Sequence, residues 1–161
     1  MKPQALNHRT VHLIDIENLC ETTFLNEGLV REVKDEYLRS INPKPQDLFV
    51  LGVSHFNLEA AVFGWGAGVA QYVVQSGLNG ADLALLEVLG EASMIDRFTE
   101  VVIASGDGIF AEAGTRLRRS GLKVGFVGRT GAISYQIVRS GCSCLELPSI
   151  RQNAEEFDLV S

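Results

Sequence analysis

The sequence contains little proline and no long apolar segment, and each of these shortages excludes a class of protein. Only four of its 161 residues are proline and 46% are hydrophobic, a composition that excludes disordered and fibrous proteins. The longest apolar stretch, residues 60–70, is interrupted by glycines and is too short to cross a bilayer. Residues 1–10 lack the apolar core of a signal peptide. We therefore expect a cytoplasmic protein that does not associate with membranes.

Cysteine and positive charge are also scarce. The three cysteines, Cys20, Cys142 and Cys144, lack the additional ligands that a zinc site needs, so we expect reduced thiols. The chain carries 14 basic and 20 acidic residues, which gives a formal net charge of -6. This charge argues against a protein that binds nucleic acid by bulk electrostatic attraction. It leaves room for an enzyme that reaches nucleic acid through metal ions, because the carboxylates that hold such ions are themselves negative.

Apolar segments with two different periods alternate along the chain. Short apolar runs predict strands at residues 10–16, 47–55, 70–77, 100–105, 122–128 and 143–147. Segments with helical spacing predict helices at residues 27–41, 57–65, 80–95, 109–121 and 132–141. We expect one domain, 1–161, with a core at about residues 9–147 and an acidic, loosely docked or poorly ordered C-terminal tail at 148–161. The positive mean hydropathy of +0.13 leaves room for a homodimer.

This alternation predicts the α/β fold class. The strands are apolar on both faces, as expected for a mainly parallel central sheet with helices on both sides, that is, a three-layer α/β/α sandwich. In such sheets, ligands bind outside the carboxyl ends of the strands, near the point where the strand order reverses. Carboxylates at several strand ends would therefore meet at one edge of the sheet.

Three aspartates lie at junctions of this kind. Asp15 ends the first predicted strand, Asp107 follows the fourth, and Asp82 lies in the first turn of the helix after the third. Because like charges repel at short range, such a cluster calls for a cation, and oxygen ligands suit Mg²⁺ or Mn²⁺. We therefore predict that these aspartates are metal ligands and catalytic residues of phosphodiester hydrolysis. Helix capping is the structural alternative for each of them.

Three segments of the chain occur in a telling order: VHLIDIENL (11–19), NGADLALLEVL (79–89) and EVVIASGDGIFAEAGTRLRRSGLKVGFVG (100–128). In this order they resemble the NYN domain, a PIN-like nuclease family that includes LabA-like and limkain-type proteins. The resemblance covers about residues 9–147 and implies a PIN-like sandwich with Mg²⁺- or Mn²⁺-dependent ribonuclease activity on RNA. It also implies an acidic site formed by Asp15 with Asn18, by Asp82, and by Asp107 with Ser105.

The chain departs from the family pattern at two places. The family usually has a second aspartate where this chain has Ile109. A lysine often precedes the helix aspartate, at positions where this chain has Leu78 and Asn79. With one carboxylate and one cation fewer, a one-metal enzyme, a slow enzyme, and a binding protein that keeps the pocket all remain open.

Four further residues are candidate substrate contacts. Asn18 and Ser105 would orient water or ligands beside the aspartates. Arg129, at the end of the fifth predicted strand, is the basic residue expected to meet a substrate phosphate. His55 follows the second strand and would contact a phosphate or carry a proton, or else serve as a loop histidine bonded to backbone.

Two other functions compete with the ribonuclease. Gly106, Gly108 and Ala111 match the G-x-G-x-x-A pattern of dinucleotide-binding oxidoreductases, although Asp107 would then face a pyrophosphate. The other competitor is a catalytically weak or inactive NYN-fold module that binds RNA or a protein. Divalent-metal binding by Asp15, Asp82 and Asp107 separates this module from a metal-dependent endoribonuclease, which is the function we predict.

Overall fold

A parallel sheet forms the centre of the computed structural model, which describes residues 9–75, 77, 80–90 and 96–150. Its six strands have the order β3-β2-β1-β4-β5-β6, and every neighbouring pair is parallel. The strands are β1 (Thr10–Asp15), β2 (Leu48–Val53), β3 (Gln71–Val74), β4 (Glu100–Ala104), β5 (Lys123–Arg129) and β6 (Ser143–Leu147). The predicted α/β class with a parallel central sheet is confirmed.

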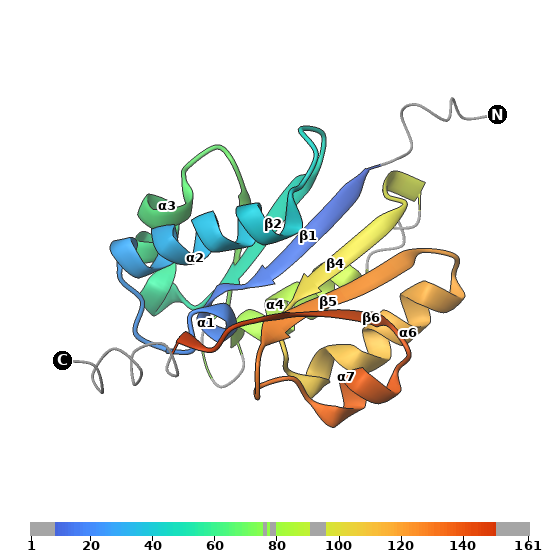
Figure 1. Ribbon diagram of the computed structural model, residues 1–161. Coiled ribbons are helices and arrows are strands. Elements are labelled where there is room, and N and C mark those ends of the chain that lie inside the picture. Colours follow the sequence, from blue (N-terminus) through green and yellow to red (C-terminus); the bar gives the residue numbers. More distant parts are fainter. Residues whose placement is uncertain (1–8, 76, 78–79, 91–95, 151–161) are drawn as a thin grey trace.

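Helices cover both faces of this sheet, as a three-layer α/β/α sandwich requires (Figure 1). One face carries α2 (Glu27–Ile41) and α3 (Leu58–Trp65), and the other carries α4 (Gly80–Leu89), α6 (Ala111–Arg119) and α7 (Tyr135–Arg139). Short helical turns follow three strands: α1 (Ile16–Leu19) after β1, η2 (His55–Asn57) after β2 and η3 (Gly108–Phe110) after β4. Among the described residues, no helix combines the length and apolar character needed to cross a membrane.

The helix α2 illustrates how local sequence sets the boundaries of an element. The Asn26 side chain accepts a hydrogen bond from Leu29 N at 2.9 Å and so caps the first turn. Asn42 adopts the left-handed conformation after the last turn, and Pro43 follows. The predicted helix 27–41 therefore has the observed bounds.

Other boundaries differ from the predictions by a few residues. The first strand ends at Asp15 rather than at residue 16, because the Asp15 side chain caps α1. The predicted helix 109–121 starts as the 3-10 turn η3 and becomes α-helical at Ala111. The end of the predicted helix 80–95 lies outside the described residues, as do Leu78, Asn79 and the tail from residue 151 onward. The first part of the predicted tail is docked, since Ser149 Oγ donates to Glu21 Oε2 at 3.1 Å.

Side chains alternate along the strands and thereby divide the core into two clusters. On β1, Leu13 packs into the cluster with α4 and α6, whereas Ile14 packs into the cluster with α2 and α3. On β4, Ile103 packs into the cluster with α4 and α6, and Ala104 packs into the cluster with α2 and α3. The strand order reverses between β1 and β4. From β1 the chain adds β2 and β3 on one side, and from β4 it adds β5 and β6 on the other side. The carboxyl ends of these two strands therefore form the crevice where ligands of such sheets bind.

Candidate functional site

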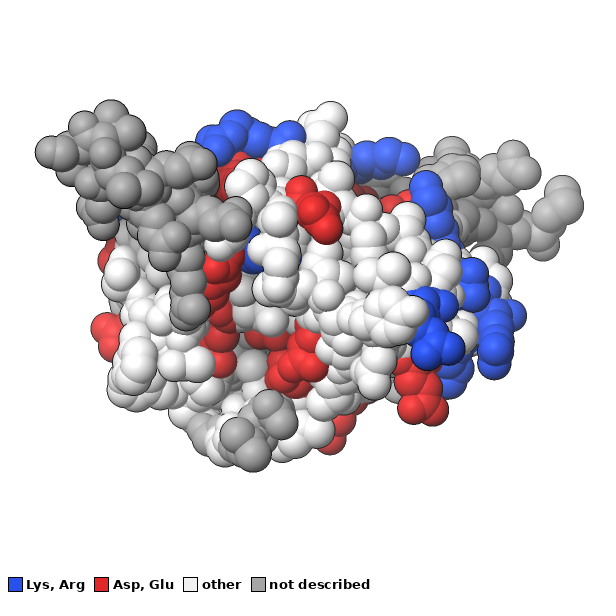
Figure 2. Space-filling view, turned by 60° about the horizontal axis from the view of Figure 1, so that its bottom comes forward, with Lys and Arg blue, Asp and Glu red and all other residues white. Residues whose placement is uncertain are grey.

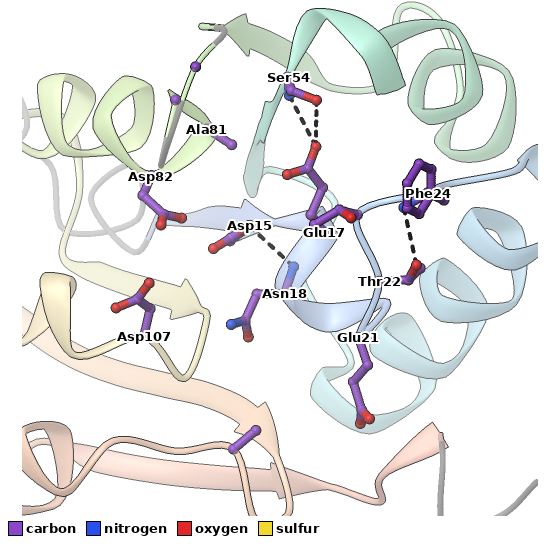
Figure 3. A pocket seen from close by; sticks show the side chains of 14 residues that line it. Asp15, Glu17, Asn18, Glu21, Thr22, Phe24, Ser54, Ala81, Asp82 and Asp107 are labelled. Carbon is purple, nitrogen blue, oxygen red and sulfur yellow. Dashed lines mark hydrogen bonds between the residues drawn. The ribbon is translucent and has the colours of Figure 1, made fainter.

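A cavity of about 860 Å³ opens at this crevice. Its lining comes mainly from the segments that follow β1, β2, β3 and β4 (Figure 3). The lining residues are Asp15, Glu17, Asn18, Glu21, Thr22, Thr23, Phe24, Ser54, Gly77, Gly80, Ala81, Asp82, Asp107 and Ala132. Within the described part of the chain, the lining thus holds five carboxylates and neither lysine nor arginine. On the face seen in Figure 2, acidic side chains gather near the middle, and basic side chains lie mainly toward the upper and right margins.

Asp15 occupies the centre of the site. It is the last residue of β1 and only 4% of its surface is exposed. One carboxylate oxygen accepts a hydrogen bond from Asn18 N at 3.3 Å, and the other accepts one from Ser105 Oγ at 3.2 Å. Asp15 therefore caps α1 and also links the ends of β1 and β4, so the capping alternative and a ligand role are compatible.

Asp82 approaches Asp15 from the first turn of α4 (Figure 3). Close packing brings this helix to the sheet, because a Cβ atom at Gly52 of β2 would lie 2.5 Å from Leu85 of α4. Asp82 is 8% exposed, and its carboxyl group lies close enough to that of Asp15 for the two to disfavour each other's charged forms.

The electrostatics of the pair disfavour two neighbouring negative charges. Burial raises the pKa of Asp15 well above its ordinary value, and the neighbouring Asp82 raises it further. Burial also raises the pKa of Asp82, and the negative charges of Asp107 and Glu17 add to this effect, although the interaction with Asp15 opposes it. The site thus favours a proton or another positive charge between the carboxylates.

Asp107 completes the acidic group from the end of β4. It caps η3, since its Oδ1 accepts a hydrogen bond from Ile109 N at 3.0 Å, and its own N–H donates to Ser105 Oγ at 3.1 Å. Asn18 joins this segment to α1, because its Oδ1 accepts from Gly106 N at 3.1 Å. All three predicted aspartates, with Asn18 and Ser105, are therefore brought together by the fold.

Glu17 and Ser54 belong to the same site, and the sequence reasoning assigned them no role. Glu17 Oε1 accepts hydrogen bonds from Ser54 Oγ at 2.6 Å and from Asn57 Nδ2 at 2.7 Å. These bonds attach the turn after β1 to the turn after β2. The strand-end rule that identified Asp15 also applies to Ser54, which directly follows β2.

The prediction that Arg129 meets a substrate phosphate near Asp107 is wrong. Arg129 is fully buried on the opposite face of the sheet, where its Nε donates to Leu19 O at 2.8 Å. The same guanidinium donates to Pro148 O at 2.9 Å and forms an ion pair with Glu36 Oε1 at 2.7 Å. Strand alternation decides its side, because Phe126 packs on the α4 face and Arg129 lies three positions further along β5.

His55 also lies outside the cavity lining. It is an exposed residue of η2, the turn that follows β2. Phe56 and Asn57, the next residues of this turn, have different environments: Phe56 is 76% exposed and Asn57 is 2% exposed. The contribution of η2 to the site comes through Asn57, which holds Glu17, rather than through the histidine.

The donor chemistry of the cavity suits a hard divalent cation. Asp15, Asp82 and Asp107 offer carboxylate oxygens, and Mg²⁺ and Mn²⁺ prefer oxygen ligands. In the described residues, no three His, Cys, Asp or Glu side chains are already arranged as a coordination shell. The fit therefore rests on the kind and charge of the donors, and on the neighbouring Asp15 and Asp82 carboxyl groups, whose negative charges a cation would offset.

The glycines after β4 are explained by packing. A Cβ atom at Gly106 would lie 2.1 Å from Ala132 O, and one at Gly108 would lie 2.4 Å from Gln136 Oε1. The backbone of Ala132 therefore requires glycine at position 106, and Gly108 fits closely against the side chains of Gln136 and Ser134. This packing accounts for the two glycines without a bound dinucleotide.

Comparison with known proteins establishes the fold alone. No family model matches the sequence, and no curated protein matches it. The chain is similar to a crystal structure from Vibrio parahaemolyticus, the protein of unknown function VPA0982, with a TM-score of 0.57 and 15% sequence identity. The similarity covers 92% of this chain and 98% of that one.

Proposed function

We propose that this protein is a metal-dependent ribonuclease of the NYN type, in which Asp15, Asp82 and Asp107 hold Mg²⁺ or Mn²⁺. One observation carries the proposal. Carboxylates from three separate strand-to-helix junctions converge in a cavity whose described lining contains no basic residue. Such an arrangement costs stability unless a cation joins it, and it lies at the switch point where ligands of parallel sheets bind.

The residues around the aspartates have roles that follow from their contacts. Ser105 holds one oxygen of Asp15, and the Asn18 backbone holds the other, so the orientation of this carboxylate is fixed before any ligand arrives. Asn18 also carries an amide that would bind water or a phosphate oxygen. A divalent cation, when bound, supplies the chemistry of phosphodiester hydrolysis by polarising the phosphoryl group and activating water.

A catalytically weak or inactive module on the same fold is the second candidate. It is favoured by the absence of basic residues from the described lining and by the burial of Arg129, which leaves that arginine bonded to Leu19, Pro148 and Glu36. Ile109, at the position where the family usually has an aspartate, also favours the inactive module. Such a module would bind RNA or a protein without cutting it.

A dinucleotide-binding oxidoreductase has less support. The strand order 3-2-1-4-5-6 occurs in that class. However, Asp15 and Asp107 would lie against a pyrophosphate, and packing accounts for the glycines of the β4 loop.

Cleavage of a labelled single-stranded RNA tests the ribonuclease. We expect cutting with Mn²⁺ or Mg²⁺ and none with EDTA, and we expect Asp107→Asn to lower the rate by about a hundredfold or more, as loss of a group that stabilises the transition state does. Glu112→Gln is the matched control, because Glu112 is an exposed carboxylate of α6 that does not line the cavity.

Metal titration by thermal unfolding tests the metal centre, and only together with the cleavage assay does it separate the two candidates. A bound cation raises the melting temperature of the natural protein, and Asp15→Asn should remove this rise. Metal binding without cutting would assign the protein to the inactive module. A protein that neither binds a divalent cation nor cuts RNA would contradict the metal centre itself.

A further inference from the structure

Two exposed phenylalanines lie together at the mouth of the acidic cavity. Phe24 is 74% exposed and Phe56 is 76% exposed. Their ring centroids are 6.0 Å apart and the rings are nearly perpendicular, at 86°. Phe24 lines the cavity, on the side away from Asp107 (Figure 3). Two large aromatic side chains are therefore held in water beside the candidate site.

A buried asparagine fixes the backbone under both rings. Asn57 is 2% exposed, and its Oδ1 accepts from Leu25 N at 3.1 Å while its Nδ2 donates to Thr23 O at 2.8 Å. These bonds hold the residues on either side of Phe24, and Asn57 itself directly follows Phe56. Because Asn57 also donates to Glu17, the rings and the acidic cavity share one hydrogen-bond network.

We propose that Phe24 and Phe56 form a stacking platform for an unpaired nucleobase of a single-stranded RNA whose backbone enters the acidic cavity. This inference rests on the proposed function and adds a base-binding surface beside the cavity. Aromatic side chains stack on bases of any sequence, and the faces of paired bases in a duplex are covered by their neighbours. A preordered platform loses little conformational entropy when it binds.

The charge of the site favours a base as the occupant. The described lining offers no lysine or arginine to a phosphate, and the chain carries a net charge of -6. Attraction between phosphates and basic side chains therefore contributes little at the cavity, so much of the RNA affinity must come from contacts that do not depend on charge. Base stacking is such a contact, and Phe24 lines the same cavity as Asp107.

Binding of a short single-stranded RNA that contains 2-aminopurine tests the platform, because stacking on an aromatic ring quenches this fluorescent base. The measurement uses the Asp107→Asn background with Mg²⁺ present, so that the RNA stays intact. We expect Phe24→Leu and Phe56→Leu each to weaken binding about tenfold and to reduce the quenching, since leucine keeps the apolar surface but has no ring face. Phe24→Tyr should bind like the parent, and Phe63→Leu is the control, because Phe63 is 62% exposed on α3.

The outcomes separate the platform from the ribonuclease. Unchanged binding and quenching in both leucine variants overturn the platform, and so does an equal loss of affinity for a duplex of the same sequence. A change in oligomeric state with unchanged RNA binding assigns the two rings to a contact between copies of the chain and also overturns it. Phe-dependent binding by a natural protein that does not cut RNA supports the platform while the ribonuclease fails. Asp107-dependent cutting together with unchanged RNA binding in the leucine variants supports the ribonuclease and overturns the platform.

Discussion

The two ends of β1 carry buried polar groups in opposite states. At the amino end, His12 contacts Tyr37 Oη through Nδ1 at 2.7 Å and Asp47 Oδ2 through Nε2 at 2.9 Å, and its ring stacks on Phe49 at 4.7 Å. At the carboxyl end, Asp15 lies among further carboxylates with no basic residue in the described lining. Both ring nitrogens of His12 therefore have partners, whereas the Asp15 carboxylate has no basic side chain beside it in the described lining.

This difference separates a structural polar group from a candidate site. Burial lowers the pKa of His12, against the influence of Asp47, so the neutral ring is favoured and both ring nitrogens are satisfied within the fold. Burial raises the pKa of Asp15 and so disfavours its charged form, and within the described lining no basic residue compensates that charge. A polar cluster that the chain does not complete by itself calls for a ligand.

The largest expected effect is on stability, at the amino end of β1. Asp47→Ala should lower the free energy of unfolding by about 2–3 kcal/mol, because it leaves the buried His12 Nε2 and the backbone N–H groups of Thr10 and Lys44 without their carboxylate partner. Urea unfolding measures this loss. Metal-induced stabilisation should persist in the folded variant. Loss of metal binding with unchanged stability would invalidate the contrast between the two ends.

The next effect is the pH dependence of stability in metal-free buffer. The native pKa of His12 lies below its ordinary value of 6.5, so below that pH the unfolded chain binds a proton that the native state does not. This group therefore makes stability fall as pH decreases, by at most about 1.4 kcal/mol per pH unit. The free energy of unfolding is measured for the natural protein and for His12→Gln across this pH range. The difference between the two gives the contribution of His12. A difference that does not change with pH would contradict the assignment.

The carboxyl end should respond in the opposite direction, with the smallest of the three effects. The raised native pKa of Asp15 means that the native state holds a proton above the ordinary value of 3.8, so stability falls as pH rises through the native pKa. Asp82→Asn keeps the shape and removes the charge conflict, so it should raise the free energy of unfolding at neutral pH by about 1 kcal/mol. The gain should shrink in acid and metal-induced stabilisation should disappear. A destabilised variant that still binds metal would show that Asp82 is structural.

Much of the acidic site could be predicted because strand ends are visible in the sequence. Asp15, Asp82 and Asp107 were placed by a topological rule that needs only the strand and helix order, and the fold brings them together. Arg129 was placed by the same rule without regard to the face of the sheet. Its position on β5 is three from Phe126, so alternation turns it toward α2.

Other parts of the site depend on contacts between distant segments. Glu17 is directed by Ser54 and Asn57, which lie 37 and 40 positions away in the chain. Phe24 and Phe56 come from separate turns, and only their contact shows that two exposed aromatic residues form one surface. The spacing of Phe24 and Phe56 in the sequence does not predict that they are in contact.

The sequence by itself determined the alternation of strands and helices, the limits of α2 and the location of three aspartates at strand-to-helix junctions. These features depend on short-range periodicity, on capping and on the chemistry of single residues. The tertiary structure decided which side chains share a face, which carboxylates lie next to one another, and that Arg129 is buried in the core while the cavity lining is acidic. These outcomes depend on burial and on distances between segments far apart in the chain, because desolvation and charge interactions exist only once those segments have packed together.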